Sequence, residues 1–157
     1  LYKLTPQAMP WGDYGDILAQ GIAWSLQDED QLQLERCGPF VPPISFPSGF
    51  LDVVVTQEMR GCLEAAGFKG LRFVPVIKHH IVRLDWRSWD LTAPEPKRYP
   101  PESEPENYIL RRKHHPATAE QIGDLWEVQA EVAVVIDQRD TLRLLARNRD
   151  EDVFRAA

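Results

Sequence analysis

The sequence has few cysteines and no long apolar run, and each shortage excludes a class of protein. Only two of the 157 residues are cysteine, too few for the disulfide framework of a small secreted domain. No run of about 18 apolar residues predicts a membrane-spanning helix, and no secretory leader is visible. We therefore expect a cytoplasmic protein without membrane insertion. A bridge between Cys37 and Cys62 stays open, as does a segment preceding Leu1, because the chain does not begin with Met.

Basic charge is also scarce. The chain has 18 lysines and arginines against 24 aspartates and glutamates, a net charge of −6 at pH 7. Proteins that bind nucleic acid normally carry a basic stripe that releases counterions from the phosphates, so we expect no nucleic-acid partner. An acidic surface keeps a protein in solution and would also suit a basic protein partner.

Sequence motifs of catalysis are missing as well: the chain has no phosphate-binding glycine loop, no nucleophile elbow and no HExxH pair. The histidines form two adjacent pairs, His79-His80 and His114-His115, and imidazole is a common zinc ligand. Neighbouring residues on a strand point to opposite faces, so each pair would offer about one ligand per face. We therefore predict exposed histidines in basic turns, no metal or other cofactor, and no enzyme.

The middle of the chain contains a complete strand–helix unit. The β-branched run 51–56 predicts a strand, and Thr56 occupies the N-cap position of a helix over about 57–66. Gly67 is placed to end that helix in a left-handed conformation. The helical spacing assigns one apolar face and makes Cys62 a small core residue; the face comprises Met59, Cys62, Leu63 and Ala66.

The remaining pattern predicts a single α+β domain over residues 1–157, with four to six mostly antiparallel strands and the helix packed on the sheet. Residues 1–38 are poorly defined, with loose helical spacing near 17–26. Prolines exclude a central strand at 39–47 and place Pro75 at a sheet edge or bulge. A Pro/Glu-rich exposed loop is expected at 92–107, a helical turn from Thr118, and either helix or strand after Thr141. Further strands are predicted at 31–38, 71–76, 78–86, 108–116 and 125–136.

A candidate binding surface follows the predicted strand 78–86. Tryptophan is enriched where protein interfaces are strongest, and aspartates beside it could pair with basic groups of a partner. Trp86 could equally cover the hydrophobic layer of the sheet, whereas Trp89 falls in the exit turn. The predicted partner-binding residues are Asp85, Trp86, Trp89 and Asp90, with Glu102 and Glu104 of the loop as secondary contacts.

The order of segments resembles the double-CXXCG-motif family of bacterial immunity proteins over roughly residues 34–155. The segments that carry the likeness are "LERCGPFVPPISFP" (34–47), residues 51–90, "ENYILRRKHHP" (106–116), "LWEV" (125–128) and "EDVFR" (151–155). The chain departs from the family name, because it keeps only Cys37-Gly38 of one motif and has Leu34 where the first cysteine would stand. The resemblance therefore implies no metal site in this chain.

The resemblance implies an immunity protein that neutralises a cognate bacterial toxin by stoichiometric binding and occlusion. The acidic balance would suit a basic nuclease toxin, whose phosphate-binding groups carboxylates can mimic. Two alternatives stay open: a binding or regulatory module of another kind, and a small enzyme that uses His79 or His80 with a carboxylate.

Overall fold

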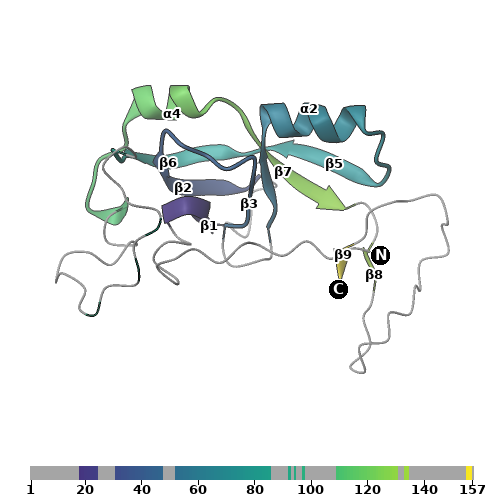
Figure 1. The fold of residues 1–157 in the computed structure, drawn as a ribbon, viewed down its shortest axis with the longest axis horizontal. Helices are drawn as coiled ribbons and strands as arrows, with labels where there is room; N and C mark the ends of the chain where they lie inside the picture. Colours follow the sequence, from purple (N-terminus) through teal and green to yellow (C-terminus); the bar gives the residue numbers. More distant parts are fainter. Residues whose placement is uncertain are drawn as a thin grey trace.

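The computed structural model describes most of the middle of the chain. The described residues are 18–24, 31–47, 52–85, Thr92, Pro94, Lys97 and 109–130, with the backbone of 133–134 and 155–156. Within them the chain forms an α+β fold, as predicted, and the strands lie below two helices (Figure 1). No helix in these residues is long and apolar enough to cross a membrane.

The first sheet has three strands in the order β1-β2-β6. β1 (Ile22–Trp24) pairs antiparallel with β2 (Gln33–Gly38), and β2 pairs parallel with β6 (Ile77–Arg83). A separate parallel pair joins β8 (Ala133–Val134) to β9 (Arg155–Ala156). β2 is central and wholly buried, which explains how the short run 33–38 becomes a strand despite its charged residues.

The second sheet has four antiparallel strands in the order β3-β4-β7-β5. The strands are β3 (Ile44–Ser45), β4 (Val54–Thr56), β7 (Leu125–Ala130) and β5 (Leu71–Pro75). Pro75 lies on the edge strand β5, where a missing backbone N–H breaks no ladder, and the prolines at 39–43 precede the edge strand β3 without belonging to a strand. Mostly antiparallel pairing is confirmed, but the strands are divided between two sheets.

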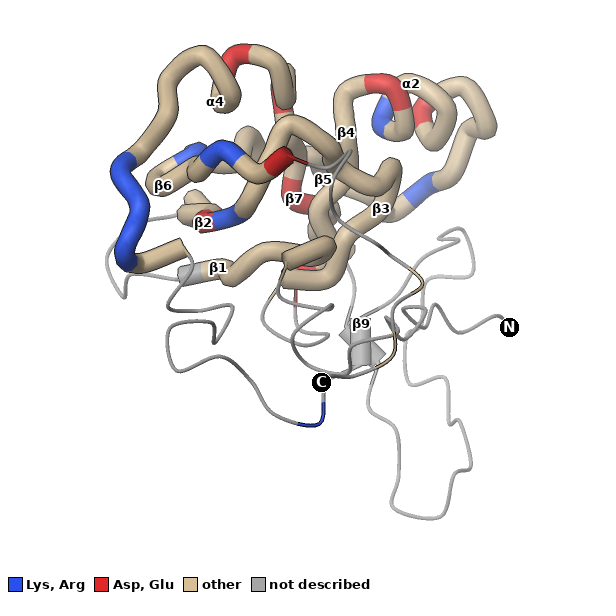
Figure 2. The backbone as a smooth tube through the Cα atoms, turned by 60° about the vertical axis from the view of Figure 1, so that its left-hand side comes forward, with Lys and Arg blue, Asp and Glu red and all other residues tan. Residues whose placement is uncertain are grey.

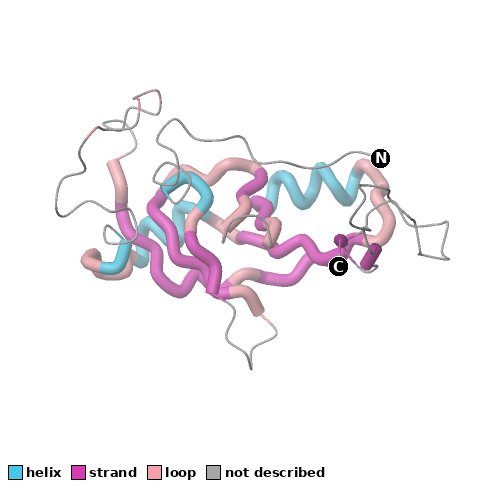
Figure 3. The backbone as a smooth tube through the Cα atoms, turned by 90° about the horizontal axis from the view of Figure 1, so that it is seen from below, coloured by secondary structure: helices cyan, strands magenta, loops and turns pink. Residues whose placement is uncertain are grey.

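Val76 is the joint between the two sheets. Its backbone N–H donates to Leu125 O of the second sheet (2.9 Å), whereas the N–H of Ile77 donates to Leu32 O beside the first (2.9 Å). β5 and β6 are thus consecutive strands that exchange partners at one residue. Seen from below, the strands form one curved run (Figure 3).

The hydrophobic core lies at this joint, beneath the helix α4 (Pro116–Ile122). Buried side chains from both sheets and from α4 form one cluster, consisting of Leu32, Leu34, Val54, Val76, Ile81, Ala119, Ile122 and Leu125. Gly38 lets α4 approach β2 closely, since a Cβ at this position would lie 2.8 Å from side-chain atoms of Thr118 and Ile122.

The helix α2 (Gln57–Ala65) begins and ends where the sequence predicts. Thr56 Oγ1 accepts from the N–H of Met59 (3.3 Å), and Gly67 follows with φ 73°. The predicted apolar face is confirmed only in part: Met59 and Leu63 are half-buried, but Cys62 and Ala66 are exposed, and α2 has no fully buried residue. Arg60 instead faces the sheet, with its guanidinium 3.9 Å from the ring centre of Trp126. This cation–π contact turns the packed side of the helix away from Cys62.

One strand prediction fails beside the first sheet. The strand expected at 108–116 is absent: Ile109 and Leu110 are helical, and residues 113–115 form a loop that leads into α4. The loose helical spacing near 17–26 includes a helical stretch at 18–20, which is followed by β1 from Ile22. Ile109 is fully buried against Cys37 and Val82, so tertiary packing overrides the strand-like sequence pattern.

Candidate functional site

An open groove lies where β6 ends, and it contains the first predicted site residue. Asp85 is exposed there, two residues after Arg83. The groove has a volume of about 640 Å³, and its lining includes Pro39, Arg83, Leu84, Asp85, His115 and Gln121. The other predicted contacts, Trp86, Trp89, Asp90, Glu102 and Glu104, lie outside the described residues, as does most of the loop 92–107.

One wall of the groove is α4, and side chains hold both of its ends. The Nδ1 atom of His115 accepts from the N–H of Thr118 (3.2 Å), which caps the first turn. At the other end, Lys78 Nζ donates to the carbonyl oxygens of Ala119 (2.7 Å) and Gly123 (2.9 Å), where a cation also complements the helix dipole. The wall is therefore fixed from β6 and from its own cap.

The first groove is also lined by Pro39, the start of the proline-rich segment 39–43, and this second wall is anchored by Arg36 of β2. Arg36, fully buried in β2, donates from Nη2 to the carbonyl oxygen of Phe40 (3.0 Å) and to that of Ala19 (2.9 Å). Its Nε also donates to Cys37 O (3.3 Å). At the far end of the segment, the N–H of Thr56 donates to Pro43 O (3.2 Å). Both ends of this wall are thus fixed to strands.

Burial perturbs both Arg36 and its neighbour Cys37. Burial lowers the pKa of Arg36 from its ordinary value to about 10, and Cys37 opposes this shift. Burial raises the pKa of the Cys37 thiol from 9.0 to about 12, against the attraction of Arg36 and Arg112. Cys37 therefore stays a protonated, packed thiol, and no nucleophile arises at this position.

The two free cysteines should differ sharply in reactivity. We expect Ellman's reagent at pH 8 to modify one thiol per folded chain rapidly, because Cys62 is exposed while Cys37 is buried with a raised pKa. Adding a denaturant should release the second equivalent. The substitution Cys62→Ser should abolish the fast phase, and equal rates for both thiols would contradict the burial of Cys37.

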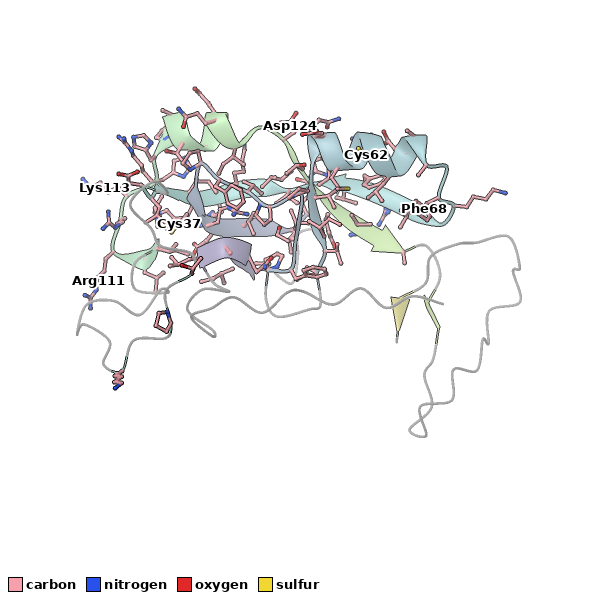
Figure 4. The ribbon with its side chains drawn as sticks, in the orientation of Figure 1. Cys37, Cys62, Phe68, Arg111, Lys113 and Asp124 are labelled. Carbon is pink, nitrogen blue, oxygen red and sulfur yellow. The ribbon has the colours of Figure 1, made fainter. Side chains whose placement is uncertain are left out.

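A second groove, of about 310 Å³, lies at the other end of α4. Carboxylates stand on both of its sides: Glu58 in the first turn of α2 and Asp124 just after α4, both exposed. Figure 4 places Asp124 between the two helices. The backbone joins the helices here, since the N–H of Gln57 donates to Asp124 O (3.1 Å). The lining also includes Pro39, Val41, Pro43 and Ile122.

The histidine pairs occupy positions that the sequence does not predict. The register of β2 and β6 shifts between Leu34 and Glu35, so that His79 is an extra residue in β6. This bulge brings both histidines of the pair to one carboxylate: His79 Nε2 lies 3.8 Å and His80 Nδ1 3.9 Å from Glu35 Oε1. The strict alternation of faces is therefore wrong here.

The second histidine pair lies beside the first and fixes the chain along β6. His114 Nδ1 accepts from the N–H of Ile81 (3.0 Å), and the N–H of His115 donates to Ile81 O (2.8 Å). His80 Nε2 lies 2.7 Å from Arg112 O. Among the described residues, no group of three or more His, Cys, Asp or Glu side chains is arranged to hold a metal ion, and the histidines serve as local hydrogen-bonding groups.

A basic run precedes His115, which lines the first groove. Arg111, Arg112 and Lys113 are all exposed, and Figure 2 shows them as a continuous blue stretch at one end, next to β6. The labelled side chains of Arg111 and Lys113 project outward in Figure 4. The surface near Asp85 is therefore mixed in charge and not uniformly acidic, although the whole chain is acidic.

Asp85 was predicted as a contact residue, but the other residues that line the groove with it were not. Pro39 and the α4 residues reach the groove through contacts between distant segments, which no local pattern reveals. One signal was available: the run from His115 through Pro116 has a capping residue followed by proline at the first helical position, a known helix start.

The chain has no match among the known proteins with which it was compared. Searches against protein-family models, curated proteins and solved structures each return nothing. The resemblance of residues 34–155 to immunity proteins stays a prediction, and the function is inferred from the sequence and from the grooves beside α4.

Proposed function

We propose that this protein is an immunity protein that neutralises a bacterial toxin by binding it stoichiometrically. The observation that carries the proposal is the groove at the end of β6, with Asp85 exposed on it. Its volume of about 640 Å³ falls in the range of ligand-binding clefts, and its lining combines charged with apolar side chains. Such a surface suits contact with another polypeptide.

The fixed walls of the groove support tight binding. The cap of α4 and the bonds from Lys78 hold one wall, and Arg36 holds the other. A surface that is already ordered loses little conformational entropy when a partner binds, so more of the contact energy appears as affinity. Neutralisation without turnover requires this kind of affinity, because the toxin stays inactive only while the inhibitor is bound, and dissociation must therefore be slow.

The predicted tryptophans would extend this surface. Trp86 follows Asp85 directly in the sequence, and Trp89 is three residues further on. Tryptophan side chains beside a groove with charged residues and fixed walls are typical of an interface hot spot. The proposal therefore keeps Asp85 and the two tryptophans as its contact residues.

Co-expression with the product of the adjacent reading frame tests the proposal. We expect the two chains to co-purify in a 1:1 complex and growth to be restored in cells that the partner alone arrests. Asp85→Lys should weaken the complex about tenfold or more, because it reverses a charge at the contact. The exposed α4 residue Glu120, which lines neither groove, provides the matched control Glu120→Lys.

Two outcomes would overturn the proposal. One is a partner that keeps its full toxicity when the protein is present in excess. The other is the absence of any complex between the purified chains at micromolar concentration. An unchanged melting temperature in Asp85→Lys would show that a loss of binding does not come from unfolding, since Asp85 is exposed.

A further inference from the structure

The two grooves beside α4 adjoin at Pro39, and together they are called the trough. Pro39 lines both of them. Along α4, Ala117 and Gln121 line the first groove, and Ile122 and Asp124 line the second. Residues of the opposite wall follow in chain order as well, from Pro39 at the first groove to Pro43 at the second. Residues of α4 or just after it and residues of the segment 39–43 thus line both grooves.

The charges at the ends of the trough are mostly acidic. Among its charged described residues, Asp85 and Arg83 lie together at one end, and Glu58 and Asp124 lie at the other. The middle is apolar, with Pro39, Val41 and Ile122 on its walls. An extended segment with an apolar centre and basic residues near its ends would match this distribution.

The proline wall also limits how a segment could bind. Pro39, Pro42 and Pro43 have no backbone N–H, and the carbonyl oxygens of Phe40 and Pro43 already accept hydrogen bonds from Arg36 and Thr56. A partner cannot therefore add to this wall as a regular strand. Recognition must come from side chains: apolar contact with the prolines and ion pairing with the carboxylates.

We propose that the trough between α4 and residues 39–43 binds an extended, basic segment of the partner protein, with lysine or arginine side chains at Asp85 and at the Glu58–Asp124 pair. This inference rests on the proposed function and names the part of the toxin that is held. The acidic residues that would bind the segment are Asp85 after β6, Glu58 in α2 and Asp124 after α4.

Charge substitution at the far end of the trough tests the inference. Relative to the unmodified protein, Glu58→Lys with Asp124→Lys should raise the Kd for the purified partner by about tenfold or more. Glu120→Lys on the outer side of α4 should change the Kd less than threefold. Glu58 stabilises the first turn of α2, and a lysine there would oppose that stabilisation. The neutral pair Glu58→Gln with Asp124→Asn is therefore measured as well. It should keep the melting temperature and show a smaller loss of affinity.

A crosslink identifies the bound segment. A photoreactive benzoyl-phenylalanine at Val41, on the wall of the trough, should label the partner on a stretch that contains at least two lysines or arginines. The same group at the exposed Arg72 of β5, which lines neither groove, should give no specific label. Peptide mapping by mass spectrometry reads out the position.

The possible results separate the two proposals. If the unmodified protein binds no partner, the proposed function fails. If it binds but the Glu58–Asp124 variants keep full affinity, or the crosslink falls on a segment without basic residues, the trough is not the contact and only the inference fails. Loss of binding in Arg111→Glu with Lys113→Glu, with the carboxylate variants unaffected, would also overturn it, by showing that an acidic partner surface is bound instead.

Discussion

Arg36→Met should lower the free energy of unfolding by about 2–5 kcal/mol, because it removes the guanidinium donor from two buried carbonyl groups and one partly buried carbonyl group. The guanidinium bonds the carbonyl oxygens of Ala19, Phe40 and Cys37, and each orphaned acceptor costs about 1–3 kcal/mol. Methionine fills similar space but donates nothing. Urea denaturation at pH 7, followed by circular dichroism, measures the loss.

One effect acts in the opposite direction and limits this loss. Burial lowers the pKa of Arg36 to about 10, so the charged form is less stable inside the protein than in water by about 3 kcal/mol. One of its nitrogens, Nη1, is also buried without a hydrogen-bond partner in the described part of the chain. Methionine removes both costs, but three lost carbonyl bonds outweigh them, so a net loss is expected.

The control is Arg72→Met on the edge strand β5. Arg72 is exposed, and its side chain bonds that of Gln129, so the change should stay within about 0.5 kcal/mol. If Arg36→Met is as stable as the unmodified protein, the cost of burying the charge equals the gain from its hydrogen bonds. In that case Arg36 would contribute only to the position of residues 39–43.

The sequence predicts local structure well wherever the signal is itself local. The cap at Thr56, the glycine at position 67 and the edge proline at position 75 are chemical requirements of single turns and strands, and all three are confirmed. The face that α2 turns toward the sheet is a different matter. Arg60 faces the sheet and Cys62 is exposed, because the guanidinium of Arg60 lies over the ring of Trp126. That contact depends on the pairing of β7, a strand far along the chain.

The candidate site shows the same limit more strongly. Asp85 could be singled out because it follows a strand and precedes a tryptophan. The bulge at His79, by contrast, depends on the register between β2 and β6, and one skipped residue moves a side chain to the other face. The trough depends on α4 lying opposite residues 39–43, which is a property of tertiary packing. Periodicity in one sequence contains neither piece of information.

Leu34→Ala should be about as damaging as Arg36→Met, with an expected loss of about 2–5 kcal/mol. Leu34 is fully buried in the central strand β2, and its cluster includes Val54 of the second sheet and Ile122 of α4. Truncation removes buried methyl groups and leaves a cavity where both sheets and the helix meet. The surface control Leu110→Ala, at a residue that is 61% exposed, should change stability by no more than about 0.5 kcal/mol.

The joint at Val76 predicts how Leu34→Ala will unfold. Because one cluster holds both sheets, weakening it should shift a single transition to lower denaturant concentration. Circular dichroism and tryptophan fluorescence should therefore report the same midpoint. Two separate transitions would show that the sheets are independent units, and a loss below about 1 kcal/mol would show that the site collapses around the truncated side chain. Either result would contradict a core shared between the sheets, and with it the fixed placement of α4 on which the trough depends.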